Sequence, residues 1–445
     1  MSVSIVHKLN MAKLSEEFYD FLTETDEPRA CSAIPDEACT DVPKNFTLNV
    51  FNGTASKLAE KIISPNLTLA WIMHYLGTSA GVIGALVPIK DAGSLLPQLF
   101  VSGKIRSFKI RKYFWAISAL VQACCWLAAG LVLYFSTTVY ISYILLALLA
   151  IFSVASGVAS VAFKDVIGKT IPKEVRGQML SYRSTFGGLL GLIAGVLLVF
   201  VLKDIADQAL YAGLFLVASL LWFIASGLFF LIEEQAGATS GGRNPVEELK
   251  NGLKIIREEA NFRNFLITRS LLMAIPLLQP FYVIIARDIA GSGWNLLGYL
   301  IVVNGLAQVV SSPIWGKIAD RSSVSLMRIS ASVAIAGIAY AMVFYWFEEA
   351  NLGFYAFLPI IFINGLAYSG ARLSRKTYLV NYAPEEDRPT YVSIANTTIG
   401  IFTIIAAGFG LIAQFFGLEA QLLFFMTMLV MVILMSYRLK KVAIG

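Results

Sequence analysis

Apolar residues gather along this chain in twelve blocks, each long enough to cross a bilayer as a helix, which takes about 20 residues. The blocks lie at 46–73, 78–102, 113–135, 139–163, 176–202, 207–232, 264–287, 293–315, 325–347, 353–376, 388–413 and 415–437. One hydrophilic connection, residues 233–263, is long, and its second part has the pattern of an amphipathic helix. The pattern predicts an all-α membrane protein whose twelve transmembrane helices form two six-helix bundles.

The hydrophilic segments divide the chain into five parts. We expect a polar leader at 1–44, an N-terminal bundle at 45–232, a linker at 233–263, a C-terminal bundle at 264–438 and a tail at 439–445. Basic residues gather in the turns after even-numbered helices, and the turn after the second helix, 103–112, holds no acidic residue. Because Lys and Arg favour cytoplasmic loops, we expect the leader, the linker and both termini in the cytoplasm of a bacterial inner-membrane protein.

Composition agrees with this class and excludes others. Hydrophobic residues make up 57% of the chain and charged residues 14%, whereas about a quarter of the residues of a soluble domain are charged. The net charge of +6 comes from basic residues in short loops, so we expect no nucleic-acid partner. The four cysteines are too few and too dispersed for a disulfide framework, and the spacing of Cys31 and Cys39 matches no common zinc pattern.

Motifs of energy-coupling and hydrolytic enzymes are absent from the sequence. It contains no G-x-x-x-x-G-K-[ST] loop for nucleotide phosphates and no H-E-x-x-H pair for zinc. We therefore expect no enzyme activity, no cofactor and no metal.

The two halves resemble each other at an offset of about 212 residues. Pro172, Glu174 and Arg176 before one helix correspond to Pro384, Glu386 and Arg388 before another. Repeats of this kind build transporters whose substrate site lies near the bilayer midplane, between halves that rock against each other.

The sequence GKIADR at 316–321, at the cytoplasmic end of the eighth helix, resembles the loop signature of the major facilitator superfamily of secondary transporters. The resemblance covers residues 45–440 and implies a fold of two pseudo-symmetric six-helix bundles. It implies conformational gating at both copies of the loop, through Gly103, Lys104 and Arg106 in the first half and Gly316, Lys317, Asp320 and Arg321 in the second. The first copy lacks the Asp, which predicts a weaker Asp–Arg latch in the N-terminal half.

Charged residues inside the first two blocks are the main functional candidates. Lys57, Glu60 and Lys61 occur at i, i+3 and i+4 in the first, and Lys90 and Asp91 interrupt the second. A charge at mid-bilayer costs at least about 2.5–3.5 kcal/mol, so such residues face a cavity or a partner. Glu60 and Asp91 are candidate proton or substrate sites, and the alternative is a set of structural ion pairs.

Further polar candidates lie in later helices. Arg183 and Arg269 suit an anionic group, or else extend to the cytoplasmic interface. Asn304, Asn364 and Asn396 contact either substrate or a neighbouring helix. Together the candidates carry a surplus of positive charge, which favours an anionic or zwitterionic substrate.

These observations predict a secondary transporter that moves a small organic solute by alternating access and is coupled to protons through Glu60 and Asp91. We expect its partners to be the solute, protons and membrane lipids, and we expect a monomer. The alternatives are a drug or lipid efflux carrier and a non-transporting receptor or scaffold with the same fold.

Overall fold

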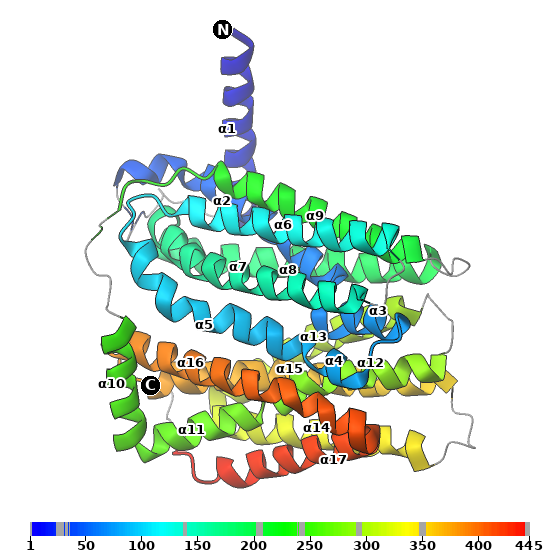
Figure 1. Ribbon diagram of the computed structural model, residues 1–445. Helices are drawn as coiled ribbons and strands as arrows, with labels where there is room; N and C mark the ends of the chain where they lie inside the picture. Colours follow the sequence, from blue (N-terminus) through cyan, green and yellow to red (C-terminus); the bar gives the residue numbers. More distant parts are fainter. Residues whose placement is uncertain are drawn as a thin grey trace.

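The computed structural model describes residues 2–23, 31, 34, 36–136, 140–201, 208–237, 239, 245–290, 296–346 and 353–440. In these ranges every regular element is a helix. Figure 1 shows the long helices running side by side in two stacked groups, one from each half of the chain. The predicted all-α membrane class and two-bundle architecture are therefore confirmed.

The N-terminal group begins with an interrupted helix. Its elements are α2 (Val42–Ile62), η2 (Pro65–Leu69), α3 (Ala70–Tyr75), α4 (Ala80–Gly84), α5 (Leu86–Arg106), α6 (Lys112–Phe135), α7 (Ile141–Thr170), α8 (Lys173–Val201) and α9 (Gln208–Phe230). Pro65 has no N–H to donate, which explains the break after α2. Ser64 covers the break, because its hydroxyl accepts a hydrogen bond from the Leu67 N–H at 3.2 Å.

The C-terminal group follows the same plan. Its elements are α11 (Ala260–Leu271), α12 (Ala274–Ala290), α13 (Leu296–Arg321), α14 (Ser323–Trp346), α15 (Gly353–Tyr382), α16 (Arg388–Ala406), η4 (Ala407–Phe409) and α17 (Gly410–Ser436). Gly417 interrupts α17 with φ +88° and ψ 167°, a conformation that favours glycine. The break lies within a few residues of the predicted junction between the last two helices.

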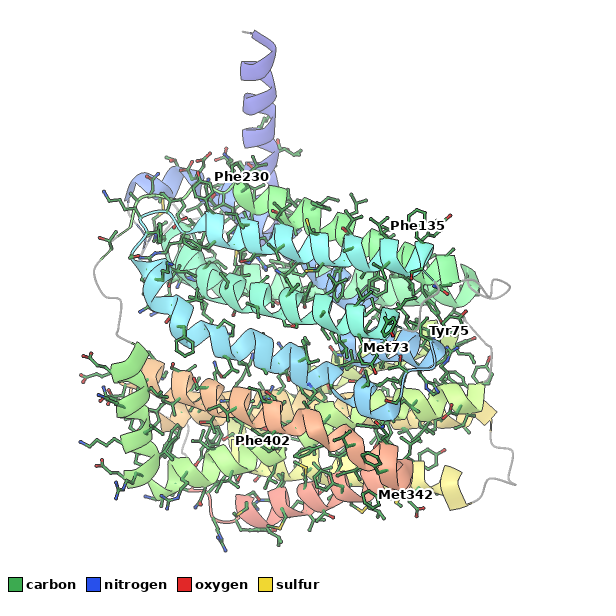
Figure 2. The ribbon with its side chains drawn as sticks, in the orientation of Figure 1. Met73, Tyr75, Phe135, Phe230, Met342 and Phe402 are labelled. Atoms are coloured by element: carbon green, nitrogen blue, oxygen red, sulfur yellow. A yellow bond between two sulfur atoms is a disulfide. The ribbon has the colours of Figure 1, made fainter. Side chains whose placement is uncertain are left out.

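Ten segments of the described chain are long and apolar enough to span a membrane. One of them, 388–436, contains the break at Gly417, and the α2–η2–α3 segment is not among the ten. The helix set is thus consistent with the predicted twelve. Exposed aromatic side chains such as Phe135 and Phe230 lie at opposite ends of the N-terminal group (Figure 2), as expected of a lipid-facing surface.

Two further helices belong to the leader and the linker. In the leader, α1 (Ser2–Thr23) precedes η1 (Asp36–Asp41), and in the linker α10 (Pro245–Glu258) runs across the ends of the C-terminal helices (Figure 1). Cys31 and Cys39 form a single disulfide, which the prediction of no disulfide framework did not anticipate. That prediction rested on the cysteine count, which does not report that a short loop can bring two of them together.

Candidate functional site

At the end of the molecule away from the basic loops, the two halves are in close contact. His74 Nε2 on α3 lies 2.7 Å from Asp288 Oδ1 on α12. Gly84 on α4 packs so closely on Gly410 that an added Cβ would lie 2.9 Å from the Gly410 Cα. Both contacts join the N-terminal half to the C-terminal half, so this end is closed.

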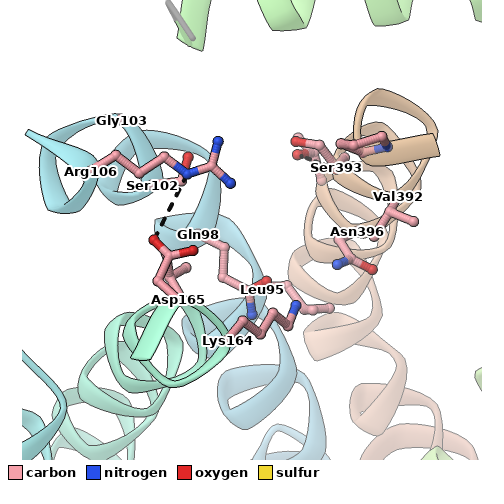
Figure 3. A pocket seen from close by; sticks show the side chains of 13 residues that line it. Leu95, Gln98, Ser102, Gly103, Arg106, Lys164, Asp165, Val392, Ser393 and Asn396 are labelled. Atoms are coloured by element: carbon pink, nitrogen blue, oxygen red, sulfur yellow. Dashed lines mark hydrogen bonds and ion pairs between the residues drawn. The ribbon is translucent and has the colours of Figure 1, made fainter. Parts of the chain in front are cut away.

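At the opposite end a cavity of about 290 Å³ separates α5 and α7 from α16. Arg106, Lys164 and Asp165 line it from the N-terminal half, and Ser393 and Asn396 line it from the C-terminal half. Figure 3 shows Lys164 and Asn396 extending into the gap between the two groups of helices. The structure is therefore closed at one end and hollow at the end that carries the basic loops.

A charged cluster lies between the two halves. Lys57 Nζ donates a hydrogen bond to Glu60 Oε2 at 2.6 Å, and their side chains are 42% and 43% exposed. The Glu60 carboxylate also interacts electrostatically with Lys90 and Arg372. Because Arg372 belongs to α15 of the other half, the accessible carboxylate faces the space between the halves. Glu60 is thus one carboxylate among several cations.

The neighbouring candidates in α2 and α5 have different partners. Lys61 Nζ donates to Gln308 Oε1 on α13 at 2.8 Å, which links the two halves directly. Lys90 interacts electrostatically with Asp91 and Tyr368. No ion pair within 4 Å joins Lys90 to Asp91 in the described part of the chain, as their directions about 100° apart on a helix imply.

Arg183 on α8 is buried and joins α8 to α2. Its Nη1 donates to the main-chain oxygen of Asn49 at 3.1 Å and to Asn49 Oδ1 at 3.3 Å. Its guanidinium carbon lies 4.3 Å from the centre of the Phe163 ring. Gly53 leaves the room for this side chain, since an added Cβ would come within 2.3 Å of Arg183 Nε. Arg183 therefore does not extend to the interface.

Arg269 on α11 has a related but sparser set of contacts. Its Nη2 donates to Asn396 Oδ1 at 2.9 Å, and Asn396 lines the cavity. Its buried Nε has no hydrogen-bond partner among the residues that the structure describes. Arg375 lies within electrostatic range and adds a second positive charge. This region can accept an anion.

The three candidate asparagines have three different surroundings. Asn304 Oδ1 accepts from Gln279 Nε2 at 3.3 Å, and Gln279 Oε1 accepts a short hydrogen bond from Asn66. Asn396 binds Arg269. Asn364 is buried, and neither its Nδ2 nor its Oδ1 has a partner in the described ranges. Asn304 is thus part of a hydrogen-bond chain of three side-chain amides from three helical elements. Both polar side-chain atoms of Asn364 are without a hydrogen-bond partner among the described residues.

Of the two loops expected to act in gating, the one in the N-terminal half is held by ion pairs to α7. Asp165 Oδ2 on α7 lies 3.2 Å from Arg111 Nη1 and 3.8 Å from Arg106 Nε, and Figure 3 shows the second pair. Another helix thus supplies a carboxylate that the first loop itself lacks, and the weaker latch in the N-terminal half stays a prediction.

The loop of the second half has no such latch. Asp320 is exposed and makes no hydrogen bond or ion pair with any residue that the structure describes. Its neighbours Lys317 and Arg321 line a separate surface hollow of about 450 Å³. Gly103 and Gly316 both lie inside long helices, and Lys104 is exposed.

Arg372 is not among the site residues that the sequence analysis proposed. A signal was present, because Asn364, Tyr368 and Arg372 recur every four residues and so share one face of α15. A polar face of that length is unusual in a membrane helix. The importance of Asp165 had no local signal, since its partners are more than fifty residues away.

Comparison with known proteins agrees with this architecture. The model of the Major Facilitator Superfamily matches residues 50–347 and 278–443. The chain belongs to this superfamily, and it is a multi-pass membrane protein by family and by fold.

Solved structures share the fold at low sequence identity. A mutant of the nucleoside transporter NupG superposes with a TM-score of 0.69 at 13% identity over 88% of this chain and 99% of that chain. A D-xylose-proton symporter gives 0.66 at 13% over 90% and 99%. A POT family transporter in complex with 5-aminolevulinic acid gives 0.68 at 11% over 92% and 98%.

Curated relatives match only part of the chain. Uncharacterized proteins of Mycobacterium bovis and Mycobacterium tuberculosis are 28% identical over 191 residues, which is 41% of this chain and 35% of each relative. The match thus spans about a third of the length of these relatives.

Proposed function

We propose that this chain carries a small organic anion or zwitterion by alternating access, with protons as the coupling ion. The observation that carries the proposal is the setting of Glu60, which pairs with Lys57 and shares its surroundings with Lys90 and Arg372. Cations outnumber carboxylates there. A negatively charged solute is the ligand that balances such a surplus away from bulk water.

The cluster suggests how the solute is held. A carboxylate or phosphate that enters it competes with Glu60 for Lys57, and the Arg372 guanidinium can hold either group through two parallel hydrogen bonds. Lys57 belongs to the N-terminal half and Arg372 to the C-terminal half. A bound anion therefore bridges the halves, as alternating access requires of a substrate site between two repeats.

Proton coupling follows from the same competition. When a substrate anion takes Lys57, the Glu60 carboxylate loses its partner, and binding a proton removes the uncompensated charge. Asp91, within electrostatic range of Lys90, is the second carboxylate that we assign to this role. One structural neighbour is named as a proton symporter, which supports the choice of ion.

We place both termini and the linker in the cytoplasm of a bacterial inner-membrane protein that works as a monomer. In this orientation the cavity beside Lys164 opens to the cytoplasm, and the contact between His74 and Asp288 closes the outer side. The loops 103–106 and 316–321 are the expected gating elements, and Asp165 stabilises the first of them.

The test is transport by the purified protein in liposomes, with a substrate chosen from anions that raise its thermal stability. We expect wild type to accumulate that anion from a pH gradient. Glu60→Gln should lose the accumulation yet retain exchange of unlabelled for labelled anion. Glu247→Gln, on the exposed face of α10, is the matched control and should behave as wild type.

Three outcomes would change the proposal. Undiminished pH-driven accumulation by both Glu60→Gln and Asp91→Asn would remove these carboxylates from coupling. Stabilisation by hydrophobic cations or lipids alone would favour an efflux carrier. Ligand binding by wild type without any transport would favour a receptor or scaffold.

A further inference from the structure

The leader helix α1 is fixed to the N-terminal half by its second part. Tyr182 on α8 donates a hydrogen bond from its hydroxyl to the Leu22 main-chain oxygen at 2.8 Å. Tyr19 is buried, and its ring meets the Phe46 ring of α2 edge to face with centroids 5.1 Å apart. One face of α1 thus packs against α2 and α8 of the N-terminal half.

The direction of α1 differs from that of the bundle. Figure 1 shows it roughly perpendicular to the long helices and projecting away from the N-terminal group, near the end where α2 begins and α9 ends. Because the long helices span the bilayer, a helix that crosses their direction lies along the membrane plane.

In residues 13–23, the part of α1 whose side chains the structure describes, the remaining surface divides into an apolar and a charged face. Leu14, Phe18 and Phe21 occur at i, i+4 and i+7 and share one face, on which Leu14 is 69% and Phe21 is 78% exposed. The charged side chains next to it are Lys13, Glu16, Glu17 and Asp20. Such a division is typical of helices that lie in a membrane interface.

The apolar face continues onto the outside of the bundle. Phe18 stacks on Phe51 of α2 with ring centroids 5.4 Å apart, and Phe51 is 50% exposed. Phe51 and Glu60 are nine residues apart, which is half a turn out of phase on a helix. Since Glu60 faces the space between the halves, Phe51 faces outward, toward lipid.

The depth of Phe51 fits an interfacial position. The segment from Val42 to Tyr75 is about 50 Å long at about 1.5 Å per residue, against a hydrocarbon core of about 30 Å. About 10 Å therefore extends beyond the core at each end. Phe51, about 14 Å from the start of α2, lies near the boundary at which in-plane helices insert their apolar face.

We propose that α1 is an in-plane membrane anchor whose Leu14–Phe18–Phe21 face rests among lipid acyl chains beside Phe51. Lipid is the occupant because the face is continuous with the lipid-facing surface of α2, and because three side chains are too few for a stable protein interface. The charged face holds three acidic side chains and one basic one, so anionic headgroups add no attraction.

Fluorescence quenching tests this placement. Single cysteines replace Phe21, Leu14 or Asp20 in a Cys124→Ser background, where Cys31 and Cys39 are paired and Cys125 is buried. Each is labelled with an environment-sensitive dye in phosphatidylcholine liposomes. At positions 21 and 14 we expect brominated lipids to quench most of the emission and aqueous iodide to quench little, with the reverse at position 20.

The result that would overturn the proposal is iodide quenching at positions 21 and 14 as strong as at position 20, because α1 then lies in water. Protection from both quenchers, together with a dependence on protein density, would instead place a second copy on this face. A marked rise in lipid quenching on adding phosphatidylglycerol would contradict the assignment to acyl chains, because it would require attraction by headgroups.

Discussion

At the basic-loop end, each half of this protein binds the adjoining end of the linker, and the two halves do so by different chemistry. In the N-terminal half, Glu234 at the start of the linker accepts the main-chain N–H groups of Arg111 and Lys112 at 2.8 and 2.6 Å and pairs with Lys169 at 2.7 Å. In the C-terminal half, Glu259, between α10 and α11, accepts hydrogen bonds from the hydroxyls of Tyr382 and Tyr391.

The difference shows that both ends of the linker act as structural parts of the bundles they adjoin. The Glu234 carboxylate lies at the N-terminus of α6, where free N–H groups favour an anion. Among the described residues, the donors to the Glu259 carboxylate are two neutral tyrosine hydroxyls. The start of the linker is thus bound to the N-terminal half through an ion pair and main-chain N–H groups. The end of the linker is bound to the C-terminal half through hydrogen bonds from tyrosine hydroxyls.

Among the substitutions that compare the two halves, Glu234→Gln is expected to lower the stability of the protein most. Its side chain is fully buried, and removing the charge leaves Lys169 unpaired, which we expect to cost about 3–5 kcal/mol. Glu259→Gln keeps an acceptor for the tyrosines, so its cost should be about 1 kcal/mol. Thermal unfolding in detergent compares them, and equal losses would contradict the distinction.

A second comparison concerns the buried Arg–Asn pairs. Arg183 on α8 binds Asn49 on α2, whereas Arg269 on α11 binds Asn396 on α16. Helix α2 corresponds to α11, since each begins its half, and α8 corresponds to α16 later in each half. In the N-terminal half the Arg lies on the later helix and the Asn on the first, whereas in the C-terminal half the Arg lies on the first helix and the Asn on the later one. An Arg–Asn contact thus occurs in each half, with the positions of the Arg and the Asn exchanged between corresponding helices.

Asn396→Ala should therefore destabilise the protein more than Asn49→Ala. The first removes the hydrogen bond that Arg269 makes to Asn396, at about 1.5–3 kcal/mol for a bond to a charged group. The second leaves the Asn49 main-chain oxygen in place for Arg183 and should cost about 0.5–1.5 kcal/mol. A reversed order in thermal unfolding would show that the side-chain bond at Asn49 is the stronger one.

Gly53→Ala tests the packing around Arg183 without removing any hydrogen bond of the Arg–Asn pair. An added methyl would lie 2.7 Å from the Arg183 Cβ, which cannot move away without shifting α8, so we expect a loss of about 1–3 kcal/mol. Gly168→Ala on α7 is the control, because nothing lies within 4 Å of the added Cβ. It should be neutral or stabilising by up to about 1 kcal/mol, and equal behaviour of the two variants would exclude a steric role for Gly53.

The smallest effect is expected at Asp41, just before α2. Burial, together with the nearby Glu233, raises the pKa of Asp41 above its usual value, while Lys44 opposes this. The folded state then binds a proton more readily than the unfolded state, so stability falls as pH rises through the raised pKa. Asp41→Asn should slightly raise the thermal midpoint at pH 7 and leave it unchanged near pH 3; a loss at pH 7 would contradict the sign.

The helices and the charged stripe of α2 could be predicted from sequence, because membrane insertion imposes length and polarity residue by residue. The pairing of Lys57 with Glu60 followed from helical spacing in the same way. The role of Asp165 could not be predicted, since it depends on how α7 packs against the loop 103–112. The proximity of Arg372 to Glu60 could not be predicted either, since it depends on how the two halves face each other.

The most direct test of the account is a thermal-shift comparison of organic anions and matched cations on wild type, Lys90→Gln and Lys250→Gln. Lys250 lies exposed on α10, outside the cluster. A bound ligand raises apparent stability by about 2.7 kcal/mol at a hundredfold excess over its dissociation constant. We predict that at least one anion stabilises wild type and Lys250→Gln, and that the effect is lost in Lys90→Gln. Stabilisation by cations alone, or an undiminished anion effect in Lys90→Gln, would contradict the assignment of this cluster as the substrate site.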